Sequence, residues 1–136
     1  MKPVLLDAGV IVAVLDNSDQ WHHVCVQAIE EVAGTLITCE AVIAESCHLL
    51  RRIHGATAKI LENVAMGVFQ IPFQLSRDSR AIQRVLQKYR DRHVDLADAC
   101  LIHLADEFKT GDILTTDSDF DIYRWGSNKP FRRLIP

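Results

Sequence analysis

Short apolar runs alternate along this chain with longer stretches whose apolar residues recur every three or four positions. The short runs predict buried strands over residues 4–6, 35–39, 68–73 and 112–116, with a last edge strand near 132–135. The periodic stretches predict helices over residues 8–15, 19–32, 40–53, 56–66, 76–89 and 94–108. Strands that alternate with helices in this way predict an α/β fold, with a mainly parallel central sheet of about four to five strands flanked by helices.

The ends of these helices are predicted from capping residues. Asp19 and Ser76 stand where two of the periodic stretches begin, and both residue types are favoured at a helix N-cap. Gly34, Gly55 and Gly111 stand just beyond the ends of three stretches, where glycine commonly stops a helix.

The length of 136 residues, about half of them apolar, predicts a single domain over residues 1–136. The longest uncharged apolar run, Ala8 to Leu15, is far shorter than the roughly 20 residues that span a bilayer. With no signal-peptide pattern at the N-terminus either, a cytoplasmic protein without membrane association is expected. The four cysteines form no Cys-x-x-Cys pair and are expected to be small buried side chains in a reducing compartment.

The net charge of −3 is unevenly distributed. Residues 1–50 carry one Lys against seven acids, a net of −6, and residues 51–136 carry fourteen Lys and Arg against eleven acids, a net of +3. Divalent cations bound to some of the acids would move the effective charge toward positive. The overall acidity therefore does not exclude a nucleic-acid substrate.

Four carboxylates interrupt apolar sequence, which is an unusual place for a charge. They are Asp7, Glu45, Asp98 and Asp117. Burying a lone ionised carboxylate is costly, so such groups are normally paired, hydrogen-bonded or bound to a cation. No Lys or Arg lies within four residues of Asp7, Asp98 or Asp117. If these acids converge, their mutual repulsion raises their pKa values, and a bound Mg²⁺ or Mn²⁺ relieves it.

Each acid taken alone has an ordinary explanation. Asp7 is a suitable N-cap for the helix that follows it, and Asp98 is a suitable acid for the first turn of a helix. Glu45 can be solvated at the flank of its helix. Asp117 and Asp119 together resemble a common Asp-rich turn. The argument for a joint site therefore depends on their order and spacing.

That order and spacing resemble the PIN-domain family, particularly the VapC-type toxins of bacterial toxin–antitoxin pairs. The resemblance covers nearly the whole chain. It is carried by the segments Leu5-Leu6-Asp7, Ala44-Glu45, Asp98-Ala99-Cys100-Leu101-Ile102 and Leu114-Thr115-Thr116-Asp117-Ser118-Asp119-Phe120. Asp95 and Asp119 fall where auxiliary acids often occur, and Thr115 falls where a hydroxyl often borders the site. One departure is plain, since Ala8-Gly9 stands where the family usually has Ser or Thr.

The resemblance implies a PIN-like three-layer fold and Mg²⁺- or Mn²⁺-dependent endonucleolytic cleavage of single-stranded or looped RNA. Asp7 and Asp98 are then expected to bind metal directly, with Asp117 completing the site and Glu45 binding metal or helping to activate the nucleophile. A small antitoxin protein is an implied partner, and a homodimer is common in the family.

A possible phosphate-binding stripe comes from residue spacing. Arg77, Arg80, Arg84 and Lys88 recur at helical intervals opposite an apolar face, which suits contact with an RNA backbone. The same spacing also suits an ordinary solvated face.

Two other functions stay open at this point. One is a PIN fold that is catalytically silent and serves as a binding module. The other is a receiver-type phosphorylation domain, because Lys129-Pro130 resembles the late Lys-Pro pair of that family. That class, however, needs paired acids after its first strand and an Asp at the end of its third strand.

Overall fold

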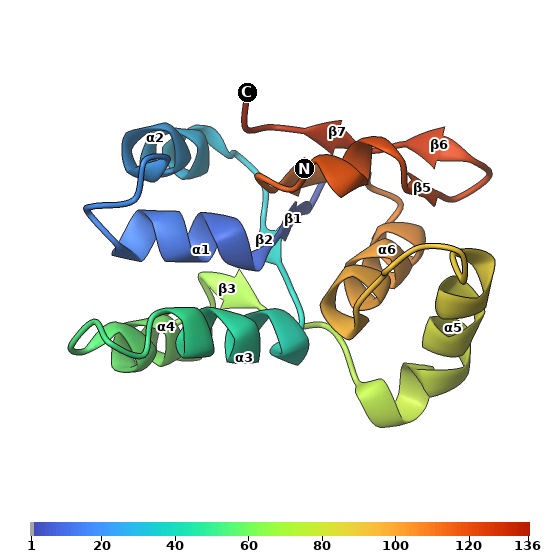
Figure 1. The fold of residues 1–136 in the computed structure, drawn as a ribbon, viewed down its shortest axis with the longest axis horizontal. Coiled ribbons are helices and arrows are strands. Elements are labelled where there is room, and N and C mark those ends of the chain that lie inside the picture. The colour runs from blue at the N-terminus through green and yellow to red at the C-terminus, as the bar shows by residue number, and fades with distance from the viewer. Residues whose placement is uncertain (1) are drawn as a thin grey trace.

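The chain, described over residues 2–136 by a computed structural model, folds around a five-stranded parallel sheet of order β3-β2-β1-β4-β7 (Figure 1). These strands are β1 (Val4–Leu6), β2 (Leu36–Ile37), β3 (Phe69–Gln70), β4 (Asp112–Leu114) and β7 (Arg132–Arg133). Residues 2–136 also form six α-helices, which are α1 (Ala8–Leu15), α2 (His22–Glu31), α3 (Glu40–Leu49), α4 (Ala56–Ala65), α5 (Leu75–Lys88) and α6 (Leu96–Phe108). A 3₁₀ turn, η1 (Ser118–Asp121), precedes an antiparallel hairpin of β5 (Arg124–Trp125) and β6 (Lys129–Pro130).

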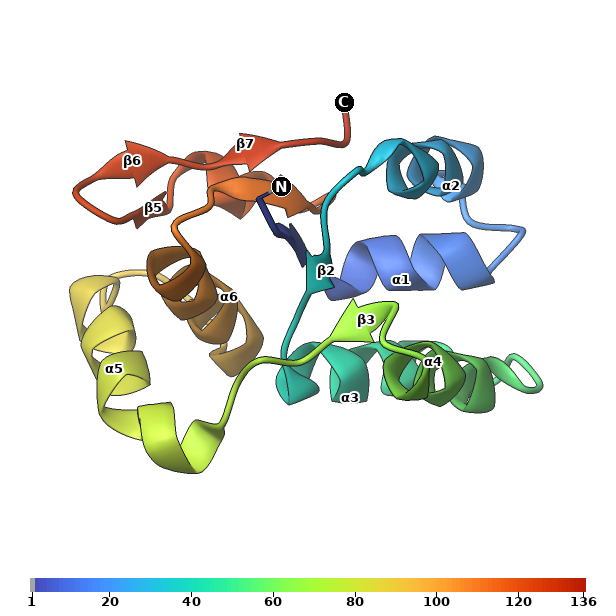
Figure 2. The same cartoon turned by 180° about the vertical axis from the view of Figure 1, so that it is seen from behind.

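Helices flank the sheet on both sides, which gives three layers. α5 and α6 pack together on one flank, and α1 and α2 pack together on the other (Figures 1 and 2). This arrangement confirms the predicted α/β class with a parallel sheet. α5, with 14 residues, is the longest helix in the described part of the chain, and none there is both long and apolar enough to cross a bilayer.

The centre of the sheet is buried on both faces, which explains why its strands are continuously apolar. Leu5, Leu6, Ile113 and Leu114 are fully buried in the neighbouring strands β1 and β4. Parallel strands covered by helices on both faces need this composition rather than an alternating one. Nine consecutive residues of α6, from Ala97 to Ala105, are also buried. α6 is thus a core helix of the protein, and it contacts β1 directly.

Several strands and helices are shorter in the structure than predicted. The strands predicted over 35–39 and 68–73 pair through only two residues each, in β2 and β3. The helix predicted to reach residue 53 ends at Leu49, and a turn leads from it to Gly55, whose φ of 79° favours glycine before α4 begins. The hairpin of β5 and β6 was not predicted.

Both predicted N-caps were wrong. Asp19 uses its carboxylate to accept a hydrogen bond from the Trp21 amide, so it closes the turn before α2 instead of capping it. α5 begins at Leu75, one residue before the predicted cap Ser76, and its N-cap Gln74 makes no side-chain capping bond. Residue type alone does not identify a cap, because the same side chain can form a hydrogen bond within a local turn instead.

We expect Leu104→Ala to lower the free energy of unfolding by about 2–5 kcal/mol, because Leu104 is fully buried in α6 and its truncation leaves a cavity. Urea unfolding followed by circular dichroism measures the change. Leu61→Ala, at an exposed position of α4, is the matched control and should alter stability by less than about 0.5 kcal/mol. Equal losses in both variants would contradict the assignment of α6 to the core.

Candidate active site

The register of β1 against β4 brings the first and last candidate acids together. Leu6 pairs with Leu114, and the Asp7 amide donates to the Leu114 carbonyl at 3.0 Å. The two parallel strands therefore end side by side, and the segments that leave them start at the same edge of the sheet. Asp7 and the Thr115–Asp117 turn follow these two strand ends.

Both oxygens of Asp7 are held in place. Oδ1 accepts a hydrogen bond from the Ala8 amide at 2.8 Å, which makes Asp7 the N-cap of α1. Oδ2 accepts a bond from the buried Thr115 hydroxyl at 2.7 Å. The same hydroxyl oxygen accepts from the Asp117 amide at 3.0 Å. Thr115 thus links two of the candidate acids, and the ordinary role of Asp7 as a helix cap coexists with its place in the site.

Asp98 enters the same region from α6. Asp95 is the N-cap of α6, and its Oδ1 accepts a bond from the Asp98 amide at 2.8 Å. The Asp98 carboxylate in turn accepts a bond from the Tyr123 hydroxyl at 3.1 Å. Asp98 and Tyr123 are both buried.

Tyr123 is a site residue that the sequence interpretation missed. It follows Phe120 by three residues after η1, and the two rings pack edge to face with centroids 5.0 Å apart. Its ring also meets that of Tyr89 at 5.2 Å. The spacing of Phe120 and Tyr123 beyond Asp117 was the available signal that a second aromatic side chain turns inward there.

Three carboxylates converge. Asp7, Asp98 and Asp117 each offer an oxygen, and these atoms lie within 4.8 Å of one another. Within residues 2–136, no Lys, Arg or His forms an ion pair with any of the three. We call these three residues the carboxylate cluster. Glu45, Asp95 and Asp119 lie outside it and are exposed.

The cluster is electrostatically strained, as its pKa values show. Burial, followed by the charges of Asp95 and Asp7, raises the pKa of Asp98 to about 7. Burial also raises the pKa of Asp7, to which the negative charge of Asp117 adds, while the bond from Thr115 opposes the shift. The pKa of Glu45 is raised by partial burial and then by Asp7 and Asp95, so Glu45 feels the cluster although it lies outside it.

These donors fit a divalent metal ion. All three are hard carboxylate oxygens, the type that Mg²⁺ and Mn²⁺ prefer. Their negative charge is not balanced by an ion pair with any cation in the described part of the chain. A bound dication would offset both the burial of charge and the mutual repulsion that raise the pKa values of Asp7 and Asp98.

The departure at Ala8-Gly9 has a structural counterpart. A Cβ added at Gly9 would lie 2.7 Å from the Thr116 Oγ1, closer than real Cβ contacts come. The Thr116 side chain therefore fills the space that a side chain at position 9 would need. A hydroxyl group is present beside Gly9, although it belongs to the turn after β4.

The basic residues of α5 are not equivalent. Arg77 donates two hydrogen bonds to Asp78, at 2.9 and 2.8 Å, and approaches Glu107 at the far end of α6. Lys88, at the other end of α5, lies over the Tyr89 ring, which packs against Tyr123. The stripe of Arg77, Arg80, Arg84 and Lys88 is exposed, and its Lys88 end connects through the rings of Tyr89 and Tyr123 to Asp98.

A receiver-type site is absent from the described residues. The Lys129 ammonium lies over the Trp125 ring, 4.9 Å from its centroid, within the β5–β6 hairpin. β3 ends at Gln70, and no acid follows it at the edge of the sheet.

Comparison with known proteins agrees with this geometry. The PIN domain family model matches residues 4–126. Ribonuclease VapC26 of Mycobacterium tuberculosis is 27% identical over 116 residues, which are 84% of this chain and 86% of that protein. The fold is similar to that of Mycobacterium tuberculosis VapC20, described as a sarcin-ricin loop cleaving toxin. That likeness has a TM-score of 0.81 and 16% identity, and covers 93% of this chain and 99% of the other.

The chain belongs to the PIN domain family. The resemblance inferred from the four acidic segments is therefore confirmed.

Because the pKa of Asp98 is raised in the folded chain, protonation favours folding. The stabilisation is fully present below the unfolded-state pKa of 3.8 and is lost as pH rises toward about 7. In a chelating buffer, the free energy of unfolding of the unmutated chain should fall by about 2–4 kcal/mol between pH 4 and pH 7.5. Asp98→Asn should remove this fall. Urea unfolding at several pH values measures this. Parallel pH profiles for Asp98→Asn and the unmutated chain would contradict the shift.

We expect Gly9→Ser to destabilise the chain by about 1–2 kcal/mol, because its Cβ collides with Thr116. In a Thr116→Ala background the cost should shrink by at least about 0.5 kcal/mol, giving a measurable coupling energy. A double-mutant cycle of thermal unfolding tests the pair. Strict additivity would show that the two positions do not compete for space.

Proposed function

We propose that this protein is a divalent-metal-dependent endoribonuclease and the toxin of a toxin–antitoxin pair. The observation that carries the proposal is the carboxylate cluster, three acids with ligand atoms within 4.8 Å of one another and no ion pair to a cation of residues 2–136. Membership of the PIN domain family and the likeness to ribonuclease VapC26 support it. The cluster stands at the carboxyl ends of parallel strands, where α/β proteins commonly bind their ligands.

Asp7, Asp98 and Asp117 would hold Mg²⁺ or Mn²⁺. Such an ion lowers the pKa of water at neutral pH and stabilises the negative charge that develops on phosphate oxygens during hydrolysis. Thr115 fixes the Asp7 carboxylate and the Asp117 backbone, and Asp95 fixes the backbone of Asp98. Tyr123 orients Asp98 through its hydroxyl. These contacts preorganise the acids before substrate arrives.

Glu45 is the acid best placed to move a proton. It is exposed at the rim of the cluster, and its pKa is raised. A carboxylate with a raised pKa is a better general base near neutral pH than an ordinary one. We assign it the activation of the attacking water, and we assign Asp119 an auxiliary role through the Asp117 turn, where its amide donates to the Asp117 carboxylate.

RNA is the proposed substrate, with products carrying 5′-phosphate and 3′-hydroxyl ends. Of the basic stripe, Lys88 and Arg84 suit backbone phosphates best, because Arg77 is bound to Asp78 away from the cluster. The resemblance further suggests a small antitoxin partner, a homodimer and a cytoplasmic location, with residues 1–136 acting as one domain.

The catalytic proposal predicts that RNA cleavage requires added Mg²⁺ or Mn²⁺ and ceases with chelator. Asp7→Asn and Asp98→Asn should each lower the cleavage rate by at least about 100-fold, because each removes a charged ligand. A fluorescence-quenched set of single-stranded and hairpin RNAs measures the rate, and circular dichroism checks the fold of each variant.

Glu30→Gln is the matched control, since Glu30 is an exposed acid of α2 whose side chain forms no hydrogen bond or ion pair within residues 2–136. It should cleave at the wild-type rate. Undiminished cleavage by both Asp variants would refute the site. Absence of cleavage by the wild-type protein, together with absence of Mn²⁺ binding, would instead favour a catalytically silent binding module.

A further inference from the structure

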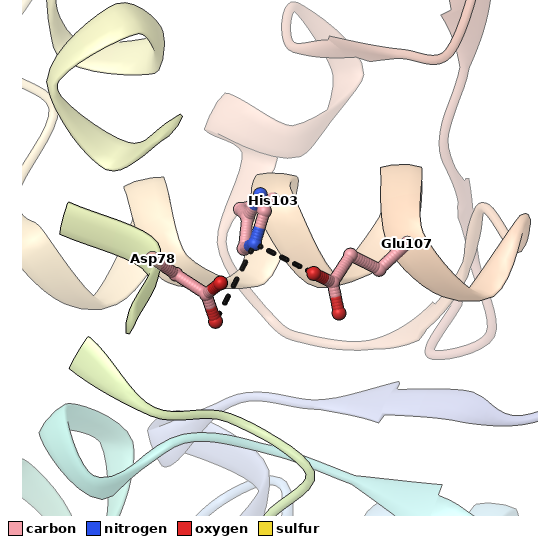
Figure 3. Close-up of side chains that lie close together, drawn as sticks. All are labelled: Asp78, His103 and Glu107. Carbon is pink, nitrogen blue, oxygen red and sulfur yellow. Dashed lines mark ion pairs between the residues drawn. The ribbon is translucent and has the colours of Figure 1, made fainter. Parts of the chain in front are cut away.

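A second group of metal-ligating side chains lies between α5 and α6. His103 and Glu107 stand one turn apart on α6, and Asp78 faces them from the first turn of α5 (Figure 3). Each offers one ligand atom, and these atoms lie within 4.8 Å of one another. His103 and Glu107 follow Asp98 by five and nine residues, or about 8 and 14 Å along the helix axis, so the group is separate from the carboxylate cluster.

The His103 side chain has an unsatisfied nitrogen. Within residues 2–136, its Nε2 is the one fully buried side-chain nitrogen or oxygen without a hydrogen-bond partner, and His103 is only 9% exposed. Nε2 lies 3.3 Å from Glu107 Oε1 and 3.7 Å from Asp78 Oδ2, and Figure 3 shows it pointing between the two carboxylates. Buried polar atoms without hydrogen-bond partners are rare, and a metal ion is one of the groups that can satisfy them.

We propose that Asp78, His103 and Glu107 bind a divalent transition metal, with zinc the best fit. Ligand atoms about 2.0–2.2 Å from a tetrahedral zinc ion lie about 3.4 Å from one another. The two distances from Nε2, 3.3 and 3.7 Å, match that spacing. Imidazole together with carboxylate oxygen is a zinc donor set, whereas Mg²⁺ prefers oxygen ligands throughout.

Arg77 is compatible with this site. It occupies one side of Asp78 through two hydrogen bonds of 2.9 and 2.8 Å. Each carboxylate oxygen has two lone-pair directions, so Asp78 Oδ2 can keep Arg77 and still bind an ion. Carboxylates that bind metals are normally oriented by such outer partners.

A proton on Nε2 is a weaker explanation than a metal ion. An imidazolium would carry the charge that the two carboxylates need, but neither of them lies in hydrogen-bonding geometry to Nε2. A metal ion satisfies all three groups at once. The bound ion would fasten α5 to α6, the helix that presents Asp98 to the carboxylate cluster.

The test uses the full chain carrying Asp98→Asn, which weakens the carboxylate cluster, in chelator-stripped buffer with excess Mg²⁺. Equilibrium dialysis measures bound Zn²⁺, thermal unfolding measures stabilisation, and the visible absorption of Co²⁺ reports the ligands. We expect one Zn²⁺ per chain and a melting temperature raised by several degrees. His103→Gln and Glu107→Gln should each weaken binding by more than about 100-fold, since even outer-shell partners are worth 10- to 100-fold.

His23→Gln is the matched control, because His23 is exposed beside His22 and near Cys25, the other place where such residues gather in sequence. It should bind Zn²⁺ as the parent does. Should His103→Gln fail to fold, Glu107→Gln decides, since that side chain is 37% exposed and is held only by ion pairs. The proposal is overturned if the parent binds no Zn²⁺, if Glu107→Gln binds it unchanged, or if His23→Gln is the variant that loses it.

Discussion

Repulsion among three carboxylates, two of them buried, is the constraint around which this protein is organised. Asp7, Asp98 and Asp117 come from three separate segments, and backbone hydrogen bonds, the Thr115 hydroxyl and the Tyr123 hydroxyl hold them close despite their like charge. The remaining fold, with its fully buried central strands and core helix, supplies the rigidity that this closeness requires. Charge repulsion that the fold maintains in this way favours the binding of a dication.

The fold class was predictable from sequence, and so was the convergence of Asp7, Asp98 and Asp117, because the signals for both are local. Asp7, Asp98 and Asp117 each interrupt an apolar run, and each run forms the strand or helix that it predicts. The length of the sheet strands was not predictable, because pairing in β2 and β3 depends on neighbours that are far away in the chain. Caps failed for a related reason, since the Asp19 side chain was already engaged in a turn.

Other contacts between segments that lie far apart in the chain could not be predicted from the sequence. Tyr123 reaches Asp98 across 25 positions, and Asp78 meets His103 only because α5 packs on α6. The hydroxyl missing at Gly9 has a counterpart in Thr116, whose Oγ1 lies beside it, and the sequence alone does not bring these two positions together. α6 links these observations, because its first turn carries a carboxylate of the cluster and its later turns carry the His103 group.

The two outermost strands of the sheet bear on how this protein associates. β3 and β7 each contain two residues, and the arginines of β7 are engaged with Asp112 and Asp121. A partner that extended the sheet would gain few backbone hydrogen bonds, because each border strand pairs through only two residues. Association through an added strand is therefore disfavoured at both borders. A protein that bound this chain would therefore have to bury side chains on another surface, away from these two borders.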